Sequence, residues 1–423
     1  MHPTLNSLTT HTVDVAIVGG GLVGASLALA LRTSGLDGAL VEANGGARAL
    51  PAATDERVTA LSLSSQRILD GLGLWSALST QVRPIRHIHV SSAGHWGVTR
   101  IDATDEGVPA LGHVVENHLL GRQLERALAG LPRLHRLQPA RVVAIDHRSD
   151  HVALDLDTGE RICARLVVAA DGARSRLREL LGIPTLERDY GQRAVVATVS
   201  TSDPPRDRAF ERFTDSGPLA MLPLTGNRAS VVWTRPSADP DLSDIGQPAF
   251  LAALQRAFGY RLGRLTAVGR IDQYPLRLVV ARQARHGRVV LLGNSAHALH
   301  PVAGQGFNLS LRDAAALAEH LAAHHTPGAL AHIEASLDAF LRSRMRDQRR
   351  VVWFTDGLAR YFRGGGAVGG GLRGLALSLV DTVPALRHGL AQISMGLTPP
   401  VPRLARGAGL PDPPSPVDEE LPA

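Results

Sequence analysis

Residues 13–24 read VDVAIVGGGLVG, and this stretch decides the fold. A β-branched, apolar run comes first, a glycine cluster follows, and residues 22–31 then carry small and apolar side chains on nearly every helical face. This order predicts a buried strand, a tight turn and a buried helix. Gly19, Gly21 and Gly24 fit the G-x-G-x-x-G spacing, which lets backbone amides approach a pyrophosphate at the helix N-terminus.

An acid follows the glycine cluster at the distance that this pattern requires. Residues 39–41 form a second apolar run, and Glu42 stands 21 residues after Gly21. At the end of the second strand of such a unit, a carboxylate accepts hydrogen bonds from ribose hydroxyls. The combination predicts a dinucleotide-binding unit on a parallel sheet, but it does not distinguish FAD from NAD.

Two further apolar runs end in short polar or glycine segments. Residues 166–170 lead into Asp171-Gly172, and residues 288–292 lead into Gly293-Asn294. Ligands of open α/β sheets collect at the carboxyl ends of strands. We therefore expect the first segment to orient the pyrophosphate region and the second to contact a ribityl chain. Either segment alone would suggest a surface turn, but together with the glycine cluster they favour FAD.

A glycine-bearing loop precedes the helix that we expect over residues 309–323. Its backbone N–H groups open onto the helix N-terminus, an arrangement that stabilises an anion. A reduced flavin carries negative charge around N1 and the C2 carbonyl, so these amides suit it, and ordinary helix capping is the alternative. The loop comprises His300, Pro301, Val302, Ala303, Gly304, Gln305, Gly306, Phe307 and Asn308.

The hydrophobic pattern predicts an α/β fold, α+β overall. We expect a Rossmann-like FAD-binding domain with a parallel sheet and an inserted β-meander at 141–163, a mainly antiparallel β-sheet substrate domain, and C-terminal helices. The expected boundaries are a disordered N-terminus at 1–12, a discontinuous FAD-binding domain at 13–193 and 276–360, the substrate domain at 194–275, a helical region at 361–398 and a disordered Pro-rich tail at 399–423.

Composition excludes several classes of protein. With 423 residues, 44% of them hydrophobic, the chain can bury one large core or two linked ones. The single cysteine, Cys163, leaves no disulfide framework and indicates a reducing compartment. The polar first twelve residues lack the pattern of a signal peptide, so we expect a cytoplasmic protein. All 45 basic residues are arginines scattered among acids, and aromatics are only 4%, which excludes the usual nucleic-acid platforms.

Several segments together resemble the class A flavoprotein aromatic hydroxylases. They are the glycine cluster, residues 55–57 (DER), residues 170–175 (ADGARS) and residues 293–308. More narrowly, residues 210–214 (FERFT), 217–223 (GPLAMLP) and 300–309 look like the branch of that family that acts in ubiquinone biosynthesis. The likeness runs from about residue 13 to residue 397. Many families share the glycine cluster, whereas the segments of the second domain and the GQGFN loop are much more selective.

The resemblance implies FAD as cofactor and NADH or NADPH as co-substrate. It assigns the adenosine half of FAD to Gly19, Gly21, Gly24 and Glu42, the surroundings of the isoalloxazine to Arg57 and residues 301–308, the phosphate and ribityl portion to Arg122 or Gln123, and a motif shared by FAD and nicotinamide to Asp171. Most of the wider family has Asp where this chain has Asn294. An Asn side chain can still hydrogen-bond a ribityl hydroxyl, but it carries no charge.

By the same resemblance, NAD(P)H reduces the flavin, O2 adds to give a C4a-hydroperoxide, and one oxygen atom passes to the ring of a 2-polyprenyl-6-methoxyphenol. A proton acceptor would activate the phenol, and His297, His300, Tyr190 and Tyr274 stay open as candidates. The residues expected at the reacting centre are Arg57, His297, His300 and Pro301. No metal is expected, because the 18 histidines show no metal-ligand spacing.

Other functions stay open. A sibling hydroxylase of the same pathway would act at another ring position or on another lipophilic phenol. A flavin-binding scaffold of a biosynthetic protein assembly would be inactive, and a flavin-dependent reductase of prenyl chains would consume no O2. A polyprenyl tail suggests peripheral contact with the inner face of a membrane through the Leu-rich segment 372–397. Docking of that segment onto the first domain fits its sequence equally well.

Overall fold

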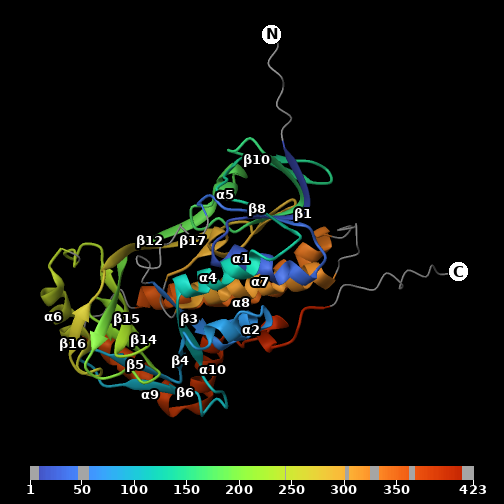
Figure 1. Ribbon diagram of the computed structural model, residues 1–423. Coiled ribbons are helices and arrows are strands. Elements are labelled where there is room, and N and C mark those ends of the chain that lie inside the picture. Colours follow the sequence, from blue (N-terminus) through green and yellow to red (C-terminus); the bar gives the residue numbers. More distant parts are fainter. Residues whose placement is uncertain are drawn as a thin grey trace, which may run out of the picture.

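A computed structural model describes residues 9–45, 57–242, 244–300, 304–323, 333–361 and 367–411, without the side chains of residues 358–361 and 367–373. Two large sheets and one small sheet form its framework, and helices stack against them (Figure 1). One large sheet is mainly parallel and the other mainly antiparallel. This mixed architecture confirms the predicted fold class.

The first sheet has the strand order β18-β19-β11-β1-β2-β8, and the strands from β19 to β8 run parallel. Strands β9 and β10 add the predicted meander to the N-terminal half of β11. The strands are β1 (Thr10–Val18), β2 (Gly38–Val41), β8 (Leu134–Leu137), β9 (Val142–His147), β10 (Val152–Leu156), β11 (Arg161–Ala169), β18 (Arg285–His286) and β19 (Val289–Leu291).

Apolar side chains on both faces of β1 make this sheet a central layer. Val15 and Ile17 pack into a core with α1 and α7, whereas Ala16 and Val18 pack into a second core with the meander and α5. Figure 1 shows α1, α4, α7 and α8 stacked along one side of the sheet. The helices are α1 (Leu22–Ala30), α2 (Leu63–Gly71), α3 (Trp75–Leu78), α4 (Asn117–Leu128), α5 (Arg176–Leu180), α7 (Gln305–Ala323) and α8 (Ile333–Tyr361), with 3-10 turns at Leu31–Thr33 and Gly293–Ser295.

The second sheet has the order β20-β17-β12-β15-β14-β13-β5-β6, with β16 beside β12. Helix α6 (Gln247–Phe258) covers one face, where Phe250 and Leu254 join a core with Phe210 and Leu219. The strands are β5 (His87–Ser92), β6 (Val98–Asp102), β12 (Thr185–Thr201), β13 (Arg208–Thr214), β14 (Gly217–Pro223), β15 (Arg228–Pro236), β16 (Leu265–Val268), β17 (Asp272–Ala281) and β20 (His297–Ala298).

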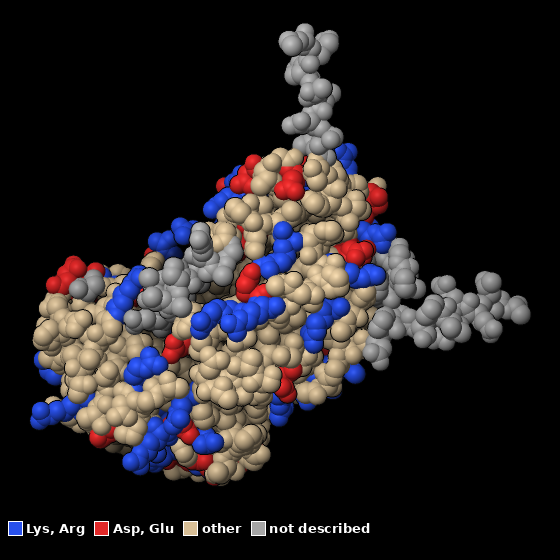
Figure 2. Space-filling view, viewed as in Figure 1, with Lys and Arg blue, Asp and Glu red and all other residues tan. Residues whose placement is uncertain are grey.

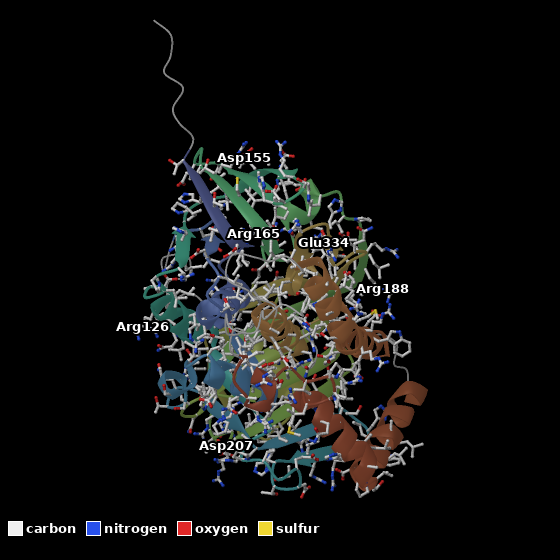
Figure 3. All side chains as sticks on the ribbon, turned by 90° about the vertical axis from the view of Figure 1, so that its right-hand side faces the viewer. Arg126, Asp155, Arg165, Arg188, Asp207 and Glu334 are labelled. Carbon is white, nitrogen blue, oxygen red and sulfur yellow. The ribbon has the colours of Figure 1, made fainter. Side chains whose placement is uncertain are left out.

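The other face of the second sheet turns toward the FAD-binding domain. A small sheet of β3 (Val58–Ser62), β7 (Gly112–Glu116) and β4 (Arg83–Ile85) packs there, and Ala60 of β3 joins a cluster with Ala209 and Leu222. Helix α8 is tied to β12 by Arg188, labelled in Figure 3, whose Nη1 donates to both oxygens of Asp356 at 2.8 and 2.7 Å. The two domains therefore share an extended interface.

Several predicted boundaries are wrong. The second sheet extends beyond 194–275 at both ends, because β12 begins at Thr185, β17 ends at Ala281 and β20 adds residues 297–298. Strands β5 and β6 fall within 13–193, yet they belong to the second sheet, because β5 pairs with β13 in parallel from His87 and Arg208 onward. A pairing between such distant segments leaves no local pattern. The predicted disorder also extends too far, since Thr10 to Thr12 already pair with β11; residues 1–8 lie outside the described part of the chain.

The C-terminal helices lie along the edge of the second sheet. Helix α9 (Ala367–Thr382) runs beside β6, where the Thr99 hydroxyl donates to the Leu377 carbonyl and the Arg100 amide donates to Asp381 Oδ1, both at 2.8 Å. Helix α10 (Pro384–Met395) follows after one residue. Within the ranges that the structure describes, no helix is long and apolar enough to cross a membrane.

The predicted disordered tail, 399–423, is wrong for residues 399–411, which the structure describes. A 3-10 turn, η5 (Leu404–Arg406), buries Leu404 and Ala405 in the core that α2 and α7 share. A Cβ on Gly71 of α2 would lie 2.7 Å from Leu404 Cδ2, so the glycine makes room for this side chain. Val401 and Leu410 pack against the same core, and the Arg403 amide donates to Glu319 Oε2 at 2.8 Å, so several contacts hold a segment whose prolines and glycines suggested disorder.

We expect Leu404→Ala to lower the free energy of unfolding by about 2–4 kcal/mol, because Leu404 is 3% exposed and truncation leaves a cavity beside α2. Urea unfolding followed by circular dichroism measures the change. The exposed Arg406→Ala in the same turn is the control and should stay within about 0.5 kcal/mol of the parent. Equal stability of both variants would contradict the packing described for η5.

Candidate active site

Four strands of the first sheet end at the same level. Val18 pairs with both Val41 and Ala169, and Ala169 pairs with Leu291, so the carboxyl ends of β1, β2, β11 and β19 are adjacent. Ligands of open α/β sheets bind at such an edge. The structure brings together there the predicted residues Gly19, Gly21, Gly24, Glu42, Asp171, Gly293 and Asn294.

Two glycines of the cluster let α1 pack against the end of β1. Gly19 has a φ of +107°, and a Cβ there would lie 2.4 Å from the Ala170 carbonyl oxygen. A Cβ on Gly24 would lie 2.0 Å from the Gly19 carbonyl oxygen. Neither position can carry a side chain without moving the backbone.

Gly21 stands beside open space. Its φ of −65° and ψ of −178° suit any residue, and a Cβ there would have no atom within 4 Å. It is the N-cap of α1, yet no side chain caps the helix and the first turn contains no acid. The positive end of the helix dipole and its uncapped amides therefore fit a pyrophosphate.

Glu42 is held in place by the backbone. Its Oε2 accepts a hydrogen bond from the Gly20 amide at 2.7 Å and its Oε1 accepts from the Asn44 amide at 2.8 Å. Each carboxylate oxygen has a further lone pair. The side chain can thus accept from ribose hydroxyls while it remains fixed at the end of β2.

Asp171 has one satisfied oxygen and one without a partner. Its Oδ2 accepts from the Leu177 amide at 3.1 Å, whereas its Oδ1 is buried and has no hydrogen-bond partner among the described residues. A buried acceptor of this kind indicates a missing donor, and a hydroxyl of FAD would supply it. Gly293, with φ of +65°, and the exposed Asn294 form the neighbouring turn.

Asn308 holds the loop before α7. Its Oδ1 accepts from the Ser62 amide at 2.8 Å and from the Ser65 hydroxyl at 2.7 Å, and its Nδ2 donates to the carbonyls of Ala60 and Gly304 at 2.8 Å each. These four bonds use the full capacity of the side-chain amide. Asn308 therefore positions the loop through the protein itself.

Other loop residues remain available to a ligand. Gln305 is 4% exposed, and its buried Oε1 has no hydrogen-bond partner within the described part of the chain. A Cβ on Gly306 would meet open space, whereas one on Gly304 would lie 3.5 Å from Ala60 Cβ. Phe307 packs on the first core. Pro301, Val302 and Ala303 lie outside the described residues, so their expected contact with the flavin stays a prediction.

Arg57 and the two candidates on α4 lie near the start of α1. The Arg57 carbonyl accepts from the amide of Asn117, the first residue of α4, at 3.0 Å. A Cβ on Gly121 would lie 3.9 Å from Leu22 Cδ2, so α4 reaches the first turn of α1. On this part of α4, Arg122 is exposed and Gln123 is half-buried.

The candidate proton acceptors have different surroundings. His300 is 1% exposed and meets the ring of Tyr190 edge-on, with ring centroids 5.1 Å apart. Burial lowers the pKa of His300 to about 4, so its imidazole is neutral at pH 7 and holds a proton weakly. Tyr190 donates its hydroxyl to Asp356 at 2.8 Å, and Tyr274 is 38% exposed.

His297 belongs to a buried network of charged residues. Its Nε2 lies 3.0 Å from Asp313 Oδ2, and Arg344 Nε donates to Asp313 Oδ1 at 2.6 Å. Burial opposes the charge on Asp313, but Arg344 and His297 outweigh it and lower the pKa of Asp313 to about 2. Arg344 also pairs with Asp347. The network fixes α7 and α8 against the strand that carries His297.

Glu211 of β13 was not among the predicted site residues. Its neighbours face α6, since Phe210 packs in the α6 core and Arg212 Nε donates to the Ala257 carbonyl at 3.0 Å. Strand alternation places Glu211 on the opposite face, toward the FAD-binding domain. Burial raises the pKa of Glu211 to about 7. An acid between Phe210 and Phe213 in a strand-like run was the signal that could have revealed it.

Surface charges of both signs are mixed on the part of the described chain that Figure 2 shows, where arginines are scattered with acids between them. Across the described ranges, no group of three or more His, Cys, Asp or Glu could hold a metal ion. The site consists of glycine turns, backbone amides and single carboxylates, and these groups fit a dinucleotide.

We expect Gly21→Ala to affect FAD binding and Gly24→Ala to affect the stability of the fold. Gly21→Ala should fold normally, because its Cβ meets no protein atom, but should weaken FAD binding at least tenfold by filling the space beside the α1 amides. Gly24→Ala should lower stability, because its Cβ meets a backbone oxygen. Flavin fluorescence titration and thermal unfolding of the flavin-free proteins separate these outcomes. Unchanged FAD binding by the folded Gly21→Ala protein would contradict this assignment.

Known proteins similar to this chain identify its family. The family model described as FAD binding domain matches residues 12–354. The chain is 38% identical over 408 residues to ubiquinone hydroxylase UbiL of Rhodospirillum rubrum, covering 94% of this chain and 93% of that protein. It is 34% identical over 319 residues to 3-demethoxyubiquinol 3-hydroxylase of Escherichia coli, covering 74% and 81%. Its fold is similar to that of p-nitrophenol 4-monooxygenase PnpA of Pseudomonas putida, with TM-score 0.76, 21% identity and coverage of 92% and 100%.

Proposed function

This chain belongs to the FAD-binding-domain family of FAD-dependent monooxygenases, and on that premise we propose that it hydroxylates the ring of a 2-polyprenyl-6-methoxyphenol in ubiquinone biosynthesis. The observation that carries the proposal is the likeness to a ubiquinone hydroxylase over nearly the full length of both proteins. The selective FERFT and GPLAMLP segments form β13 and β14 of the second sheet, which supports a substrate role for that sheet.

The chain's own residues would bind FAD in a fixed orientation. The glycine cluster and the α1 amides would hold the pyrophosphate, Glu42 the adenosine ribose, and Asp171 a hydroxyl of the cofactor. The side-chain oxygen Oε1 of Gln305 and the loop that Asn308 holds would lie against the isoalloxazine. FAD, when bound, supplies the redox chemistry that links NAD(P)H, O2 and the ring.

The proposed reaction consumes one NAD(P)H, one proton and one O2 for each ring hydroxylated. One oxygen atom replaces a ring hydrogen as hydroxyl, the other leaves as water, and NAD(P)+ is released. The protein contributes by excluding water and orienting the phenol between the two domains. The interface around Ala60, Ala209 and Leu222 is apolar, as a ring with a prenyl tail requires.

Purified FAD-loaded protein should oxidise NADH or NADPH and take up O2 faster when a short-tailed 2-prenyl-6-methoxyphenol is added. Mass spectrometry of the product should show one added oxygen, derived from 18O-labelled O2. The same phenol with its hydroxyl methylated serves as the control and should give little product. Flavin that stays bound without substrate-dependent oxidation or product would refute the substrate while leaving the FAD site intact.

A hydroxylase of the same pathway that acts at another ring position is the second candidate. The likeness to 3-demethoxyubiquinol 3-hydroxylase favours it, because that relative's name specifies a different ring substrate. Nuclear magnetic resonance of the product identifies the ring carbon that gained the hydroxyl. Competition between the methoxyphenol and the corresponding demethoxy quinol identifies the preferred substrate.

We further propose a membrane-facing surface, formed by Trp96, Leu375, Leu379 and Leu386. These are four of the eleven large apolar side chains that are exposed in the described part of the chain. A Cβ on Gly97 would lie 2.2 Å from the Gly374 carbonyl oxygen, which places Trp96 next to the start of this face of α9. Arg100, whose side chain is 67% exposed, lies beside it. An interfacial Trp, leucines and a nearby arginine favour an anionic lipid surface as the occupant.

Replacing Leu375 and Leu379 together by Ser should reduce flotation with phosphatidylglycerol vesicles about tenfold or more. Both leucines would be buried in the lipid when the protein binds, and this burial stabilises the bound state. Leu186→Ser replaces an exposed leucine of β12; it is the control and should float like the parent. Both variants should retain FAD and melting temperature. A parent protein that never floats, or a double variant that floats equally, would contradict the lipid-facing surface.

A further inference from the structure

Glu211 stands in an apolar row of the second sheet. It pairs with Val90 of β5 on one side and with Ala220 of β14 on the other, and Ala220 in turn pairs with Val232 of β15. Directly paired residues present their side chains on the same face of a sheet. The carboxyl group therefore has aliphatic neighbours along this row.

The row lies next to the loop that precedes α7. Ala209, two residues before Glu211 on the same face, belongs to the cluster that also contains Ala60. Ala60 in turn lies against Gly304. Two residues of a strand span about 7 Å. Glu211 therefore lies about that distance along β13 from Ala209, which packs against the residues beside the loop.

The Glu211 carboxyl has no hydrogen bond or ion pair with the residues that the structure describes, although its side chain is only partly exposed. The charged groups on the same face are already paired. Arg228 Nη2 lies 3.2 Å from Glu116, Asp381 lies 3.6 Å from Arg100, and Asp272 lies 2.7 Å from Arg270. His89, Arg208 and Arg212 lie on the α6 face. Nothing in the described protein compensates a charge on Glu211.

We propose that Glu211 is the group that accepts the phenolic proton of the substrate. The inference rests on the proposed function and names a catalytic residue for it. The phenol O–H bond breaks, the proton joins a carboxylate oxygen of Glu211, and the electron pair stays on the ring oxygen. That pair raises electron density at the ortho and para carbons, where the ring is hydroxylated. The proton passes to solvent when product leaves.

The raised pKa of Glu211, about 7, suits this role because a general base works best when its pKa lies near the operating pH. The unpaired carboxylate also explains why a phenol would be drawn to this position. A phenolic hydroxyl would supply the hydrogen bond that the protein does not give. His300, with its lower pKa, accepts a proton far less readily at pH 7.

The test compares Glu211→Gln, Glu211→Asp and Asp215→Asn in FAD-loaded protein. Asp215→Asn is the matched control, because Asp215 is exposed in the turn of the same hairpin. With the short-tailed methoxyphenol, kcat/KM of the parent should rise with pH through about 7. Glu211→Gln should lower kcat/KM by about a hundredfold or more and abolish the rise. Glu211→Asp should keep a pH-dependent rise at a reduced rate, and Asp215→Asn should match the parent.

Binding without NAD(P)H gives a readout that does not require turnover. Titration followed by flavin absorption should show the parent binding the phenol about tenfold more tightly at pH 8 than at pH 6, and its methyl ether equally at both. Glu211→Gln should lose this dependence. A Glu211→Gln protein with the parent's pH profile and phenol preference would overturn the inference. A parent that hydroxylates no phenol but still prefers the phenol at high pH would refute the proposed function and leave Glu211 as a phenol-binding group.

Melting temperature checks that the variant is folded and that the carboxyl is perturbed. Because the pKa of this carboxyl is raised in the folded state, the folded protein loses stability relative to the unfolded chain as pH rises from about 4.5 to about 7. The melting temperature of Glu211→Gln should therefore equal that of the parent near pH 4.5 and exceed it at pH 8. Loss of this difference would contradict the environment described for Glu211.

Discussion

One constraint governs the structure: the parallel strands β1, β2, β11 and β19 end side by side at one edge of the sheet. The register of β1 with β2 and β11, and of β11 with β19, fixes the turns that follow them relative to one another. A slip by one residue would turn Val15 and Ile17 out of one core and into the other. Buried packing therefore sets the spacing of Gly19, Glu42 and Asp171, and the ligand edge inherits the rigidity of the sheet.

Two buried acceptors near this edge have no hydrogen-bond partner among the described residues. Asp171 Oδ1 and Gln305 Oε1 are buried acceptors without donors in the described protein, although Asn308 nearby is fully bonded. Each unpaired group costs about 1–3 kcal/mol. A ligand that supplies the missing donors recovers this energy, so binding and folding stability are linked. The buried charges around Asp313 hold α7 and α8 against β20 without any ligand.

Much of the fold was predictable because its signals are local. The strand–turn–helix unit lies within residues 10–30, and the meander shows its alternation in sequence. The parallel pairing of β5 with β13 has no such signal, because it joins segments from different parts of the chain. The burial of Leu404 depends on a glycine in α2 that only the folded structure brings near. Glu211 was not predicted as a site residue for a related reason. Its raised pKa comes from its surroundings, and the sequence alone does not say which face of β13 is enclosed.

The position of η5 has a consequence for how the molecule is made. The first core holds β1, the helices around it and, last, Leu404 and Ala405. During synthesis an N-terminal domain ordinarily completes its fold while later segments are still being added. Here the nascent chain keeps a gap beside α2 until almost the entire polypeptide has been translated. The buried residues of the α6-side core of the second sheet end at Val268, so all of them are synthesised well before Leu404.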